Sequence, residues 1–248
     1  MELIKTPSFE LAVVTCGNKA FDKLAICLPG RLDTKDYGNF ISHIEYLKTK
    51  GFYALAFDPP GTWDSPGNFA FTTTSYIKAV NELIEYFGNK STLLLGHSRG
   101  GQVAQVVGTL NPAVKAIVLI NASFGPPSLP DPKDVHNNTF VELRDLPPGT
   151  SETEKQRKFL LSMNYFKDAE KYDPLPVLRS WVNPKLIIYG VNDPFYSPRE
   201  VKEIFDSLGE PKMLYEINTD HEYRYVPEAI EEVNVVIGQF LDKYPWKL

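Results

Sequence analysis

Three polar residues that lie far apart in the sequence could together perform nucleophilic catalysis. Ser98 lies in the stretch GHSRG, Asp193 in NDPF and His221 in TDHEY. A serine hydroxyl is a weak nucleophile until a neighbouring base takes its proton. A histidine can be that base, and a carboxylate fixes its tautomer and stabilises its cation. The chemistry indicated is attack of Ser98 on a carbonyl group, with His221 as base and Asp193 as the acid that orients it.

The surroundings of Ser98 strengthen this hypothesis. GHSRG fits Gly-x-Ser-x-Gly, a short pattern that also occurs in tight turns without catalytic function. Here it follows an apolar run at 92–96 and precedes GQVAQVVGTL, which has the pattern of a helix. A strand, a sharp turn and a helix are the setting in which such a serine is presented to substrate. Gly96 and Gly100 would leave space where the strand and helix pack closely.

Other polar residues near these motifs have structural explanations. His43 falls on the expected solvent face of a helix, and His97 is expected to point away from the neighbouring serine and pack within the turn. His136 has no assigned role. Asp58 follows a strand early in the chain, and Asp220 borders His221 but should point another way. We therefore expect neither aspartate to be the orienting acid.

Short apolar runs alternate with amphipathic ones, and these are the elements that must position the three residues. The apolar runs lack polar alternation, as do strands covered on both faces. This alternation predicts an α/β fold with a mostly parallel, doubly wound sheet. The predicted strands are 10–16, 23–29, 53–58, 92–96, 116–122, 185–190 and 212–218, and the predicted helices 38–51, 72–88, 197–209 and 227–244.

One segment interrupts the alternation. Residues 124–184 are rich in proline, contain no clear strand pattern and include one charged helical pattern at 151–172. A structureless loop of this length is uncommon in a compact domain. We therefore predict a small helical cap at 124–184, inserted late in the chain over one end of a core formed by 1–123 and 185–248.

The composition limits the class of protein. The 248 residues are 43% hydrophobic, and 26 basic against 31 acidic side chains give a net charge of −5 without a basic block, which argues against a nucleic-acid partner. Cys16 and Cys27 are expected to be reduced, buried thiols. No signal-peptide pattern or apolar run of about 18 residues is present, so we expect a cytoplasmic protein without a membrane span. Ligand spacing for a metal and nucleotide-binding motifs are also lacking, so no cofactor is expected.

Five motifs in order resemble the α/β-hydrolase superfamily over nearly the whole chain: CLPGR, FDPPGTWDSPG, GHSRGG, GVNDPF and DHEYR. The order Ser, Asp, His along the chain is that of this fold. The size and single cap are similar to those of compact carboxylesterases, including the cinnamoyl and feruloyl esterases. The resemblance implies an oxyanion hole formed by the backbone N–H of Arg99 and that of Arg31 or Leu32. The family often has His-Gly where this chain has Pro29-Gly30, so a histidine that braces this loop is missing.

Several side chains are candidates for the substrate pocket. The arginines Arg31 and Arg99 could bind an anionic group through their side chains, or be solvated or ion-paired. Aromatic residues at helical spacing are also explained by packing alone. The candidate pocket residues are Leu32, Trp63, Phe124, Phe140, Tyr165 and Phe166.

The function predicted from these residues is hydrolysis of a small-molecule carboxylic ester through an acyl-enzyme. An acyl-thioesterase would use the same three residues. An aminopeptidase would need an acidic cluster near the cap to hold a free amine, for which Glu142, Asp145 and Glu152 are available. A non-catalytic ligand-binding relative is the alternative from another class.

Overall fold

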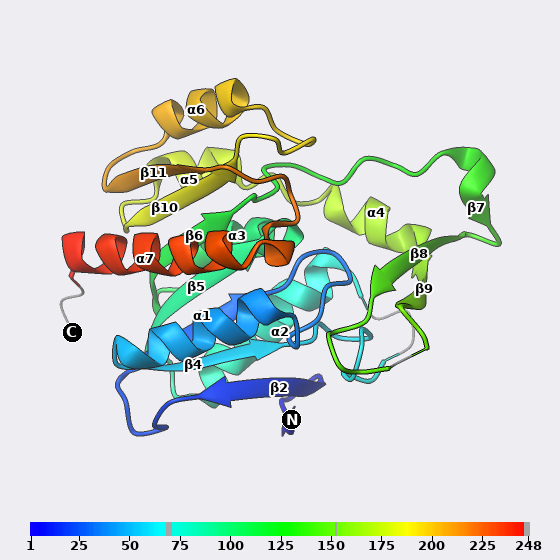
Figure 1. The fold of residues 1–248 in the computed structure, drawn as a ribbon, viewed down its shortest axis with the longest axis horizontal. Coiled ribbons are helices and arrows are strands. Elements are labelled where there is room, and N and C mark those ends of the chain that lie inside the picture. Colours follow the sequence, from blue (N-terminus) through cyan, green and yellow to red (C-terminus); the bar gives the residue numbers. More distant parts are fainter. Residues whose placement is uncertain (68–70, 152, 246–248) are drawn as a thin grey trace.

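The computed structural model describes residues 1–67, 71–151 and 153–245, and its centre is an eight-stranded sheet (Figure 1). The strand order is β1-β2-β4-β3-β5-β6-β10-β11. Strand β2 is antiparallel to both of its neighbours, and every other pair is parallel. The bounds are β1 Glu2–Lys5, β2 Glu10–Cys16, β3 Lys23–Leu28, β4 Phe52–Phe57, β5 Ser91–His97, β6 Val114–Ile120, β10 Lys185–Gly190 and β11 Lys212–Ile217.

The predicted fold class is confirmed, and all seven predicted strands are present. The central strands β3, β4, β5, β6 and β10 are almost fully buried, as their unbroken apolar runs indicate. Strand β1 was not predicted, because it has four residues, three of them exposed.

Helices cover both faces of the sheet. One face packs against α1 and α7, which lie in front of the sheet in Figure 1, and the other packs against α2, α3, α5 and α6. Each layer buries its own apolar core against the sheet. The helix bounds are α1 Gly38–Thr49, α2 Thr73–Tyr86, α3 Arg99–Leu110, α5 Leu175–Ser180, α6 Pro198–Ser207 and α7 Pro227–Lys243.

Residues 124–169 of the segment 124–184 lie beyond the carboxyl ends of the parallel strands, at the right of Figure 1, whereas α5 lies back beside β10 and packs against α3. The segment contains a three-stranded antiparallel sheet of β7 (Val135–His136), β8 (Thr139–Asp145) and β9 (Gln156–Ser162), followed by α4 (Met163–Ala169) and α5. The expectation of a helical cap is therefore wrong in part, because residues 156–162 of the predicted charged helix form a strand. In β8, Val141 is exposed while Glu142 is buried, which reverses the usual pattern and hides the strand in the sequence.

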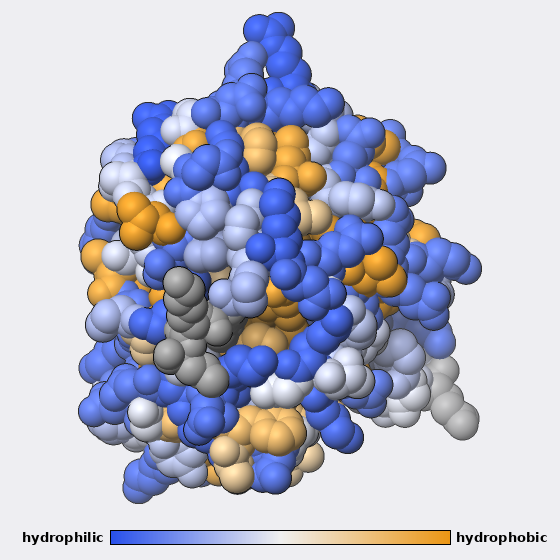
Figure 2. All heavy atoms as spheres, turned by 90° about the vertical axis from the view of Figure 1, so that its left-hand side faces the viewer, coloured by the Kyte–Doolittle hydropathy of each residue, from blue (hydrophilic) through white to orange (hydrophobic). Residues whose placement is uncertain are grey.

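The opposite end of the molecule has a mixed surface. In Figure 2, hydrophobic residues on this face lie in separate groups among hydrophilic ones. Within the described ranges, no helix combines the length and the apolar character needed to cross a membrane.

Candidate active site

Ser98 occupies the sharp turn between β5 and α3. Its backbone has φ 52° and ψ −117°, a strained conformation for a residue with a side chain. The turn can form because its glycines allow close backbone contact. A Cβ atom at Gly100 would lie 2.0 Å from the Leu28 carbonyl oxygen, and one at Gly96 would lie 2.4 Å from the carbonyl oxygen of Gly100. The role predicted for both glycines is confirmed.

Ser98, His221 and Asp193 lie in one hydrogen-bonded row. His221 Nε2 is 2.9 Å from Ser98 Oγ, and His221 Nδ1 is 2.8 Å from Asp193 Oδ2. The three residues follow β5, β11 and β10, whose carboxyl ends share one edge of the sheet. The fold thus brings His221 into contact with Ser98, 123 residues away in the sequence, and with Asp193, 28 residues away.

The partners of His221 determine its tautomer. Because a carboxylate accepts hydrogen bonds, Nδ1 carries the proton toward Asp193, and Nε2 is left to accept the proton of Ser98 Oγ. The other oxygen of Asp193 accepts the backbone N–H of Phe195 at 2.8 Å. The ring of Phe195 packs edge-on against His221 at 4.6 Å, which limits the positions that the imidazole can adopt.

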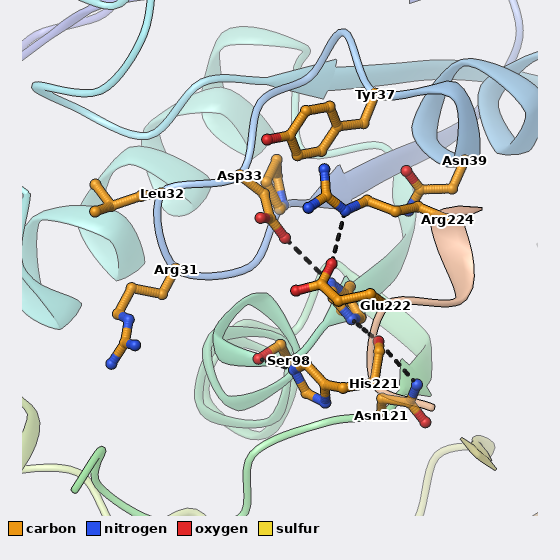
Figure 3. A network of polar contacts seen from close by, with 12 residues as sticks. Arg31, Leu32, Asp33, Tyr37, Asn39, Ser98, Asn121, His221, Glu222 and Arg224 are labelled. Atoms are coloured by element: carbon orange, nitrogen blue, oxygen red, sulfur yellow. Dashed lines mark hydrogen bonds and ion pairs between the residues drawn. The ribbon is translucent and has the colours of Figure 1, made fainter. Parts of the chain in front are cut away.

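His97 does more than pack within the turn. It points away from Ser98, as expected, but its Nδ1 lies 3.2 Å from Asp33 Oδ2 and its Nε2 lies 3.0 Å from the backbone oxygen of His221. The same oxygen accepts a bond from Asn121 Nδ2 at 3.1 Å. The dashed lines of Figure 3 mark this chain of contacts, which holds the backbone of His221 from two sides. Sequence reasoning missed Asp33, because its partner is 64 residues away.

Asp33 and His97 each stabilise the charged form of the other. Burial by itself would raise the pKa of Asp33, but the hydrogen bond and positive charge of His97 lower it to about 2. Burial likewise opposes the charge of His97, while Asp33 raises the pKa of that imidazole. Both ring nitrogens of His97 face acceptors, a carboxylate and a carbonyl, so both donate hydrogen bonds.

The loop that contains Pro29, Arg31 and Leu32 is braced through its carbonyl groups. The Tyr76 hydroxyl donates to the Pro29 oxygen at 3.0 Å, Arg144 Nε to the Arg31 oxygen at 2.9 Å, and Trp63 Nε1 to the Leu32 oxygen at 2.8 Å. Leu32 has φ 59° and is buried. These three side chains brace the loop where the resembled family often has a histidine.

A cavity of about 430 Å³ opens beside Ser98 and His221. Of the six predicted pocket residues, Phe140 and Phe166 line it. The other four lie behind the walls, which corrects the prediction. Leu32, Phe124 and Tyr165 are almost fully buried in packing, and Trp63 packs against Tyr37 and Phe159. The loop after β6 contains one predicted pocket residue, Phe124, but the cavity is lined by other residues of that loop: Ser123, Gly125, Pro126, Pro127, Ser128, Leu129 and Pro130.

Charged residues at the cap face of the cavity are largely paired. Glu142 binds Arg31 at 3.1 Å and Arg144 at 2.5 Å. Asp145 accepts hydrogen bonds from Gln156 and Tyr225. The acidic side chains proposed to hold an amine are thus already occupied where the structure describes them, and Glu152 lies outside the described residues.

The predictions for the remaining polar residues, His43, His136 and Asp58, have different outcomes. His43 is fully buried, not solvent-facing, because Nδ1 lies 2.7 Å from Asn234 Oδ1 and Nε2 lies 2.9 Å from the Tyr223 hydroxyl. His136 is exposed on β7 and does not line the cavity. Asp58 has the predicted structural role, since its carboxylate binds Lys35 Nζ at 2.9 Å.

One acidic cluster has the spacing of a metal site. The carboxylates of Asp36, Asp58 and Asp64 lie within 4.8 Å of one another. Lys35 Nζ contacts all three, at 2.7, 2.9 and 2.8 Å respectively. The ammonium group thus supplies the positive charge that a metal ion would bring, so this cluster is an ion-pair network in this fold.

Solved structures with this fold include several hydrolases. A ferulic-acid complex of Est1E from Butyrivibrio proteoclasticus has a TM-score of 0.77 at 17% identity, with 98% of this chain and 99% of that chain covered. Monoacylglycerol lipase from Paleococcus ferrophilus has a TM-score of 0.73 at 21% identity, covering 95% and 99%. The thioesterase domain from the curacin biosynthetic pathway has a TM-score of 0.73 at 12% identity, covering 95% and 98%. At these identities the likeness is one of fold.

Sequence comparison gives the family directly. None of the curated protein sequences is a significant match to the chain. The family model described as PhoPQ-activated pathogenicity-related protein matches residues 154–245, less than half of the chain. The family model described as alpha/beta hydrolase fold matches residues 25–166, more than half of it, and includes Ser98. The chain therefore belongs to the alpha/beta hydrolase fold family, and this membership supports a hydrolytic enzyme.

Proposed function

We propose that the protein hydrolyses carboxylic esters through an acyl-enzyme formed on Ser98. The observation that carries this proposal is the row of Ser98, His221 and Asp193, with contacts of 2.9 and 2.8 Å, at the wall of a cavity. The strained backbone of Ser98 holds its hydroxyl at that wall. A serine outside a catalytic site has no need of this conformation or of these two partners.

The reaction would have two stages. His221 Nε2 takes the proton of Ser98 Oγ as the oxygen attacks the ester carbonyl, and Asp193 stabilises the resulting imidazolium. The oxyanion accepts hydrogen bonds from the backbone N–H of Arg99 and from that of Arg31 or Leu32. Collapse of this intermediate expels the alcohol, which takes its proton from His221. Water then attacks the acyl-enzyme by the same route and releases the acid.

Two features favour an ester over a peptide with a free amino terminus. The Glu142 carboxylate, which could hold an ammonium group, is shared by Arg31 and Arg144. Asp33 lines the cavity but is paired with His97. A thioester would meet the same three residues, so kcat/KM on acyl-CoA and on oxygen esters of matched chain length separates these two substrate classes.

The test combines labelling with kinetics. The wild-type protein should react with a fluorophosphonate probe and release 4-nitrophenol from 4-nitrophenyl butyrate. Ser98→Ala should abolish labelling and lower kcat by about 10⁴ or more while the circular dichroism spectrum is unchanged, and His221→Gln should give a similar loss of kcat.

Ser123→Ala is the matched control, because Ser123 lines the same cavity, and no histidine or carboxylate among the described residues is hydrogen-bonded to its hydroxyl. This variant should keep the label. Labelling that persists in Ser98→Ala, or a wild-type protein that neither labels nor hydrolyses any ester, would overturn the proposal and leave a ligand-binding relative of the family.

A further inference from the structure

Arg99 differs from the other arginines that line the cavity. Arg31 and Arg144 share the carboxylate of Glu142, at 3.1 and 2.5 Å. Among the residues that the structure describes, no carboxylate lies within salt-bridge distance of Arg99. The sequence left three explanations for this side chain: an anionic ligand, solvation or an ion pair. The described part of the structure shows no ion pair and places the residue on the cavity wall, not on the open surface.

The guanidinium of Arg99 is buried as well as unpaired. The residue is 4% exposed, and burial lowers its pKa, with the charge of Arg31 as a further cause. A buried cation without a counter-ion is costly, and most folds avoid it. Here the buried cation is Arg99, which directly follows Ser98 in the chain and lines the cavity. Such a placement is typical of a site that awaits a ligand of opposite charge.

The hydrogen bonds of Arg99 leave part of the guanidinium free for such a ligand. Its Nη1 donates to Gln102 Oε1 and, at 3.0 Å, to the carbonyl oxygen of Gly125. Both acceptors are neutral. Within the described ranges, no carboxylate or carbonyl group accepts a hydrogen bond from Nε or Nη2. The buried Tyr165 hydroxyl lies beside the guanidinium and interacts with it by charge and by a hydrogen bond. Among the described residues, this hydroxyl has no other polar partner.

The anionic residues of the cavity wall do not neutralise this charge. Asp33 is bound to His97 and Glu222 to Arg224, at 3.2 and 2.6 Å. Among the arginines, aspartates and glutamates that the structure describes on the cavity wall, Arg99 is therefore the residue without an oppositely charged partner. A guanidinium edge with two N–H donors matches the two oxygens of a carboxylate.

We propose that the side chain of Arg99 binds a carboxylate of the substrate, so that the enzyme prefers esters that carry a free carboxylate group. The substrate class is that of half-esters of dicarboxylic acids or of esters formed by a hydroxy acid. This inference rests on the proposed esterase function, because it assigns the substrate of the same cavity. The competing explanation is a structural one, in which Arg99 only holds the loop at Gly125 and favours no substrate over another.

Matched pairs of substrates test the preference. One arm compares the mono-4-nitrophenyl esters of glutaric and adipic acid with their methyl 4-nitrophenyl diesters, so that the carboxylate lies in the acyl group. A second arm compares 4-acetoxybenzoate with methyl 4-acetoxybenzoate, so that it lies in the leaving group. Uncatalysed rates are subtracted, because a carboxylate can assist its own hydrolysis. We expect kcat/KM to favour the carboxylate in at least one arm by about tenfold or more.

Variants assign the preference to Arg99. The readout is the ratio of the two kcat/KM values, which is insensitive to any general loss through the neighbouring oxyanion donor. Arg99→Gln should bring the ratio to about one, and Arg99→Lys should retain part of it. Arg199→Gln is the matched control, because Arg199 is exposed on α6 and its loss changes the net charge equally. Ratios near one in both arms, or a preference that survives in Arg99→Gln, would overturn the inference.

A binding measurement separates this inference from the proposed function. Calorimetry on Ser98→Ala should detect monomethyl glutarate, which has one carboxylate, and should not detect dimethyl glutarate. The double variant Ser98→Ala/Arg99→Lys should bind monomethyl glutarate more weakly, and equal binding of both esters would contradict the role of Arg99. If Ser98 proves to be the nucleophile but no carboxylate preference appears, only the inference fails. If Ser98→Ala still hydrolyses esters, the proposed function fails.

Discussion

The turn at Ser98 and the cap at 124–184 face the same cavity but are held together by different forces. At the turn, backbone packs against backbone, and Gly96, Gly100 and their neighbours are buried. In the cap, exposed apolar residues such as Leu160 coexist with buried charged ones such as Glu142. The turn is therefore specified by sterics and the cap by pairing of side chains. Backbone packing gives the proposed nucleophile a rigid position. Side-chain pairs, in contrast, can be replaced one at a time, which suits a wall that contacts the substrate.

The largest expected effect comes from a methyl group placed in the turn. Gly100→Ala would bring a Cβ atom to within 2.0 Å of the Leu28 carbonyl oxygen, so backbone must move. We expect a loss of more than about 4 kcal/mol in the free energy of unfolding, or no folded protein. Gly125→Ala in the loop toward the cap meets nothing within 4 Å and should change stability by less than about 0.5 kcal/mol. Urea unfolding of both variants is the measurement, and equal stabilities would show that the contrast is wrong.

As the pH falls, we expect the core to lose stability before the cap does. His43 between α1 and α7 has its pKa lowered by burial to about 4. Because its pKa in the unfolded chain is higher, the unfolded chain binds a proton first as the pH falls, and stability is lost between about pH 6.5 and 4. Lowering the pH from 7 to 5 should cost about 2 kcal/mol through this residue.

Urea midpoints across this pH range check the prediction. His43→Gln should flatten the pH dependence, although it lowers stability at pH 7. His136→Gln, in the exposed part of the cap, should leave the slope of the wild type. A slope that is unchanged in His43→Gln would place the acid sensitivity elsewhere.

Removal of one charge should loosen the cap and spare the core. Glu142→Gln leaves Arg31 and Arg144 without their shared carboxylate. We expect the local stability of β8 and β9 to fall by about 1–2 kcal/mol, seen as faster amide hydrogen exchange in these strands, while the sheet core stays protected. Glu154→Gln is the control, since no ion pair of Glu154 is found within the described ranges. Equal exchange in both variants would mean that this pairing does not hold the cap.

The smallest effect is expected on the outer face of the cap. Leu160 on β9 is 53% exposed and lies opposite Val141 in the hairpin. Leu160→Thr should change the free energy of unfolding by less than about 0.5 kcal/mol. A loss of several kcal/mol in urea unfolding would indicate that this face is covered in solution.

The buried strands of the core, and the row of Ser98, His221 and Asp193, could be predicted from the sequence because both depend on local patterns. Unbroken apolar runs mark the buried strands that precede Ser98 and Asp193, and His221 follows β11, a half-buried strand with a weaker apolar pattern. Parallel strands end at one edge, so the three side chains could be expected to meet.

The cap and the support of the site depend on distant partners, which a single sequence does not reveal. Val141 exposed and Glu142 buried reverse the pattern that identifies a strand. His97 is understood only with Asp33, and Trp63 only with the carbonyl of Leu32 that it braces. The sequence left Arg99 open between binding an anionic group, solvation and an ion pair, until the structure gave its burial and its lack of a carboxylate partner among the described residues.

Arg144 joins the cap to the loop that contains Arg31. It extends from β8, binds Glu142 in the cap and also holds the carbonyl of Arg31. Strands β6 and β10, which flank the cap in the chain, pair directly with each other, so the sheet itself would tolerate a foreign cap. A chimera with a cap from another member of the fold would nonetheless lose the clamp on Arg31, unless an arginine equivalent to Arg144 came with it. A transplanted cap would therefore need to restore this contact, together with the ion pair of Glu142 with the Arg31 side chain.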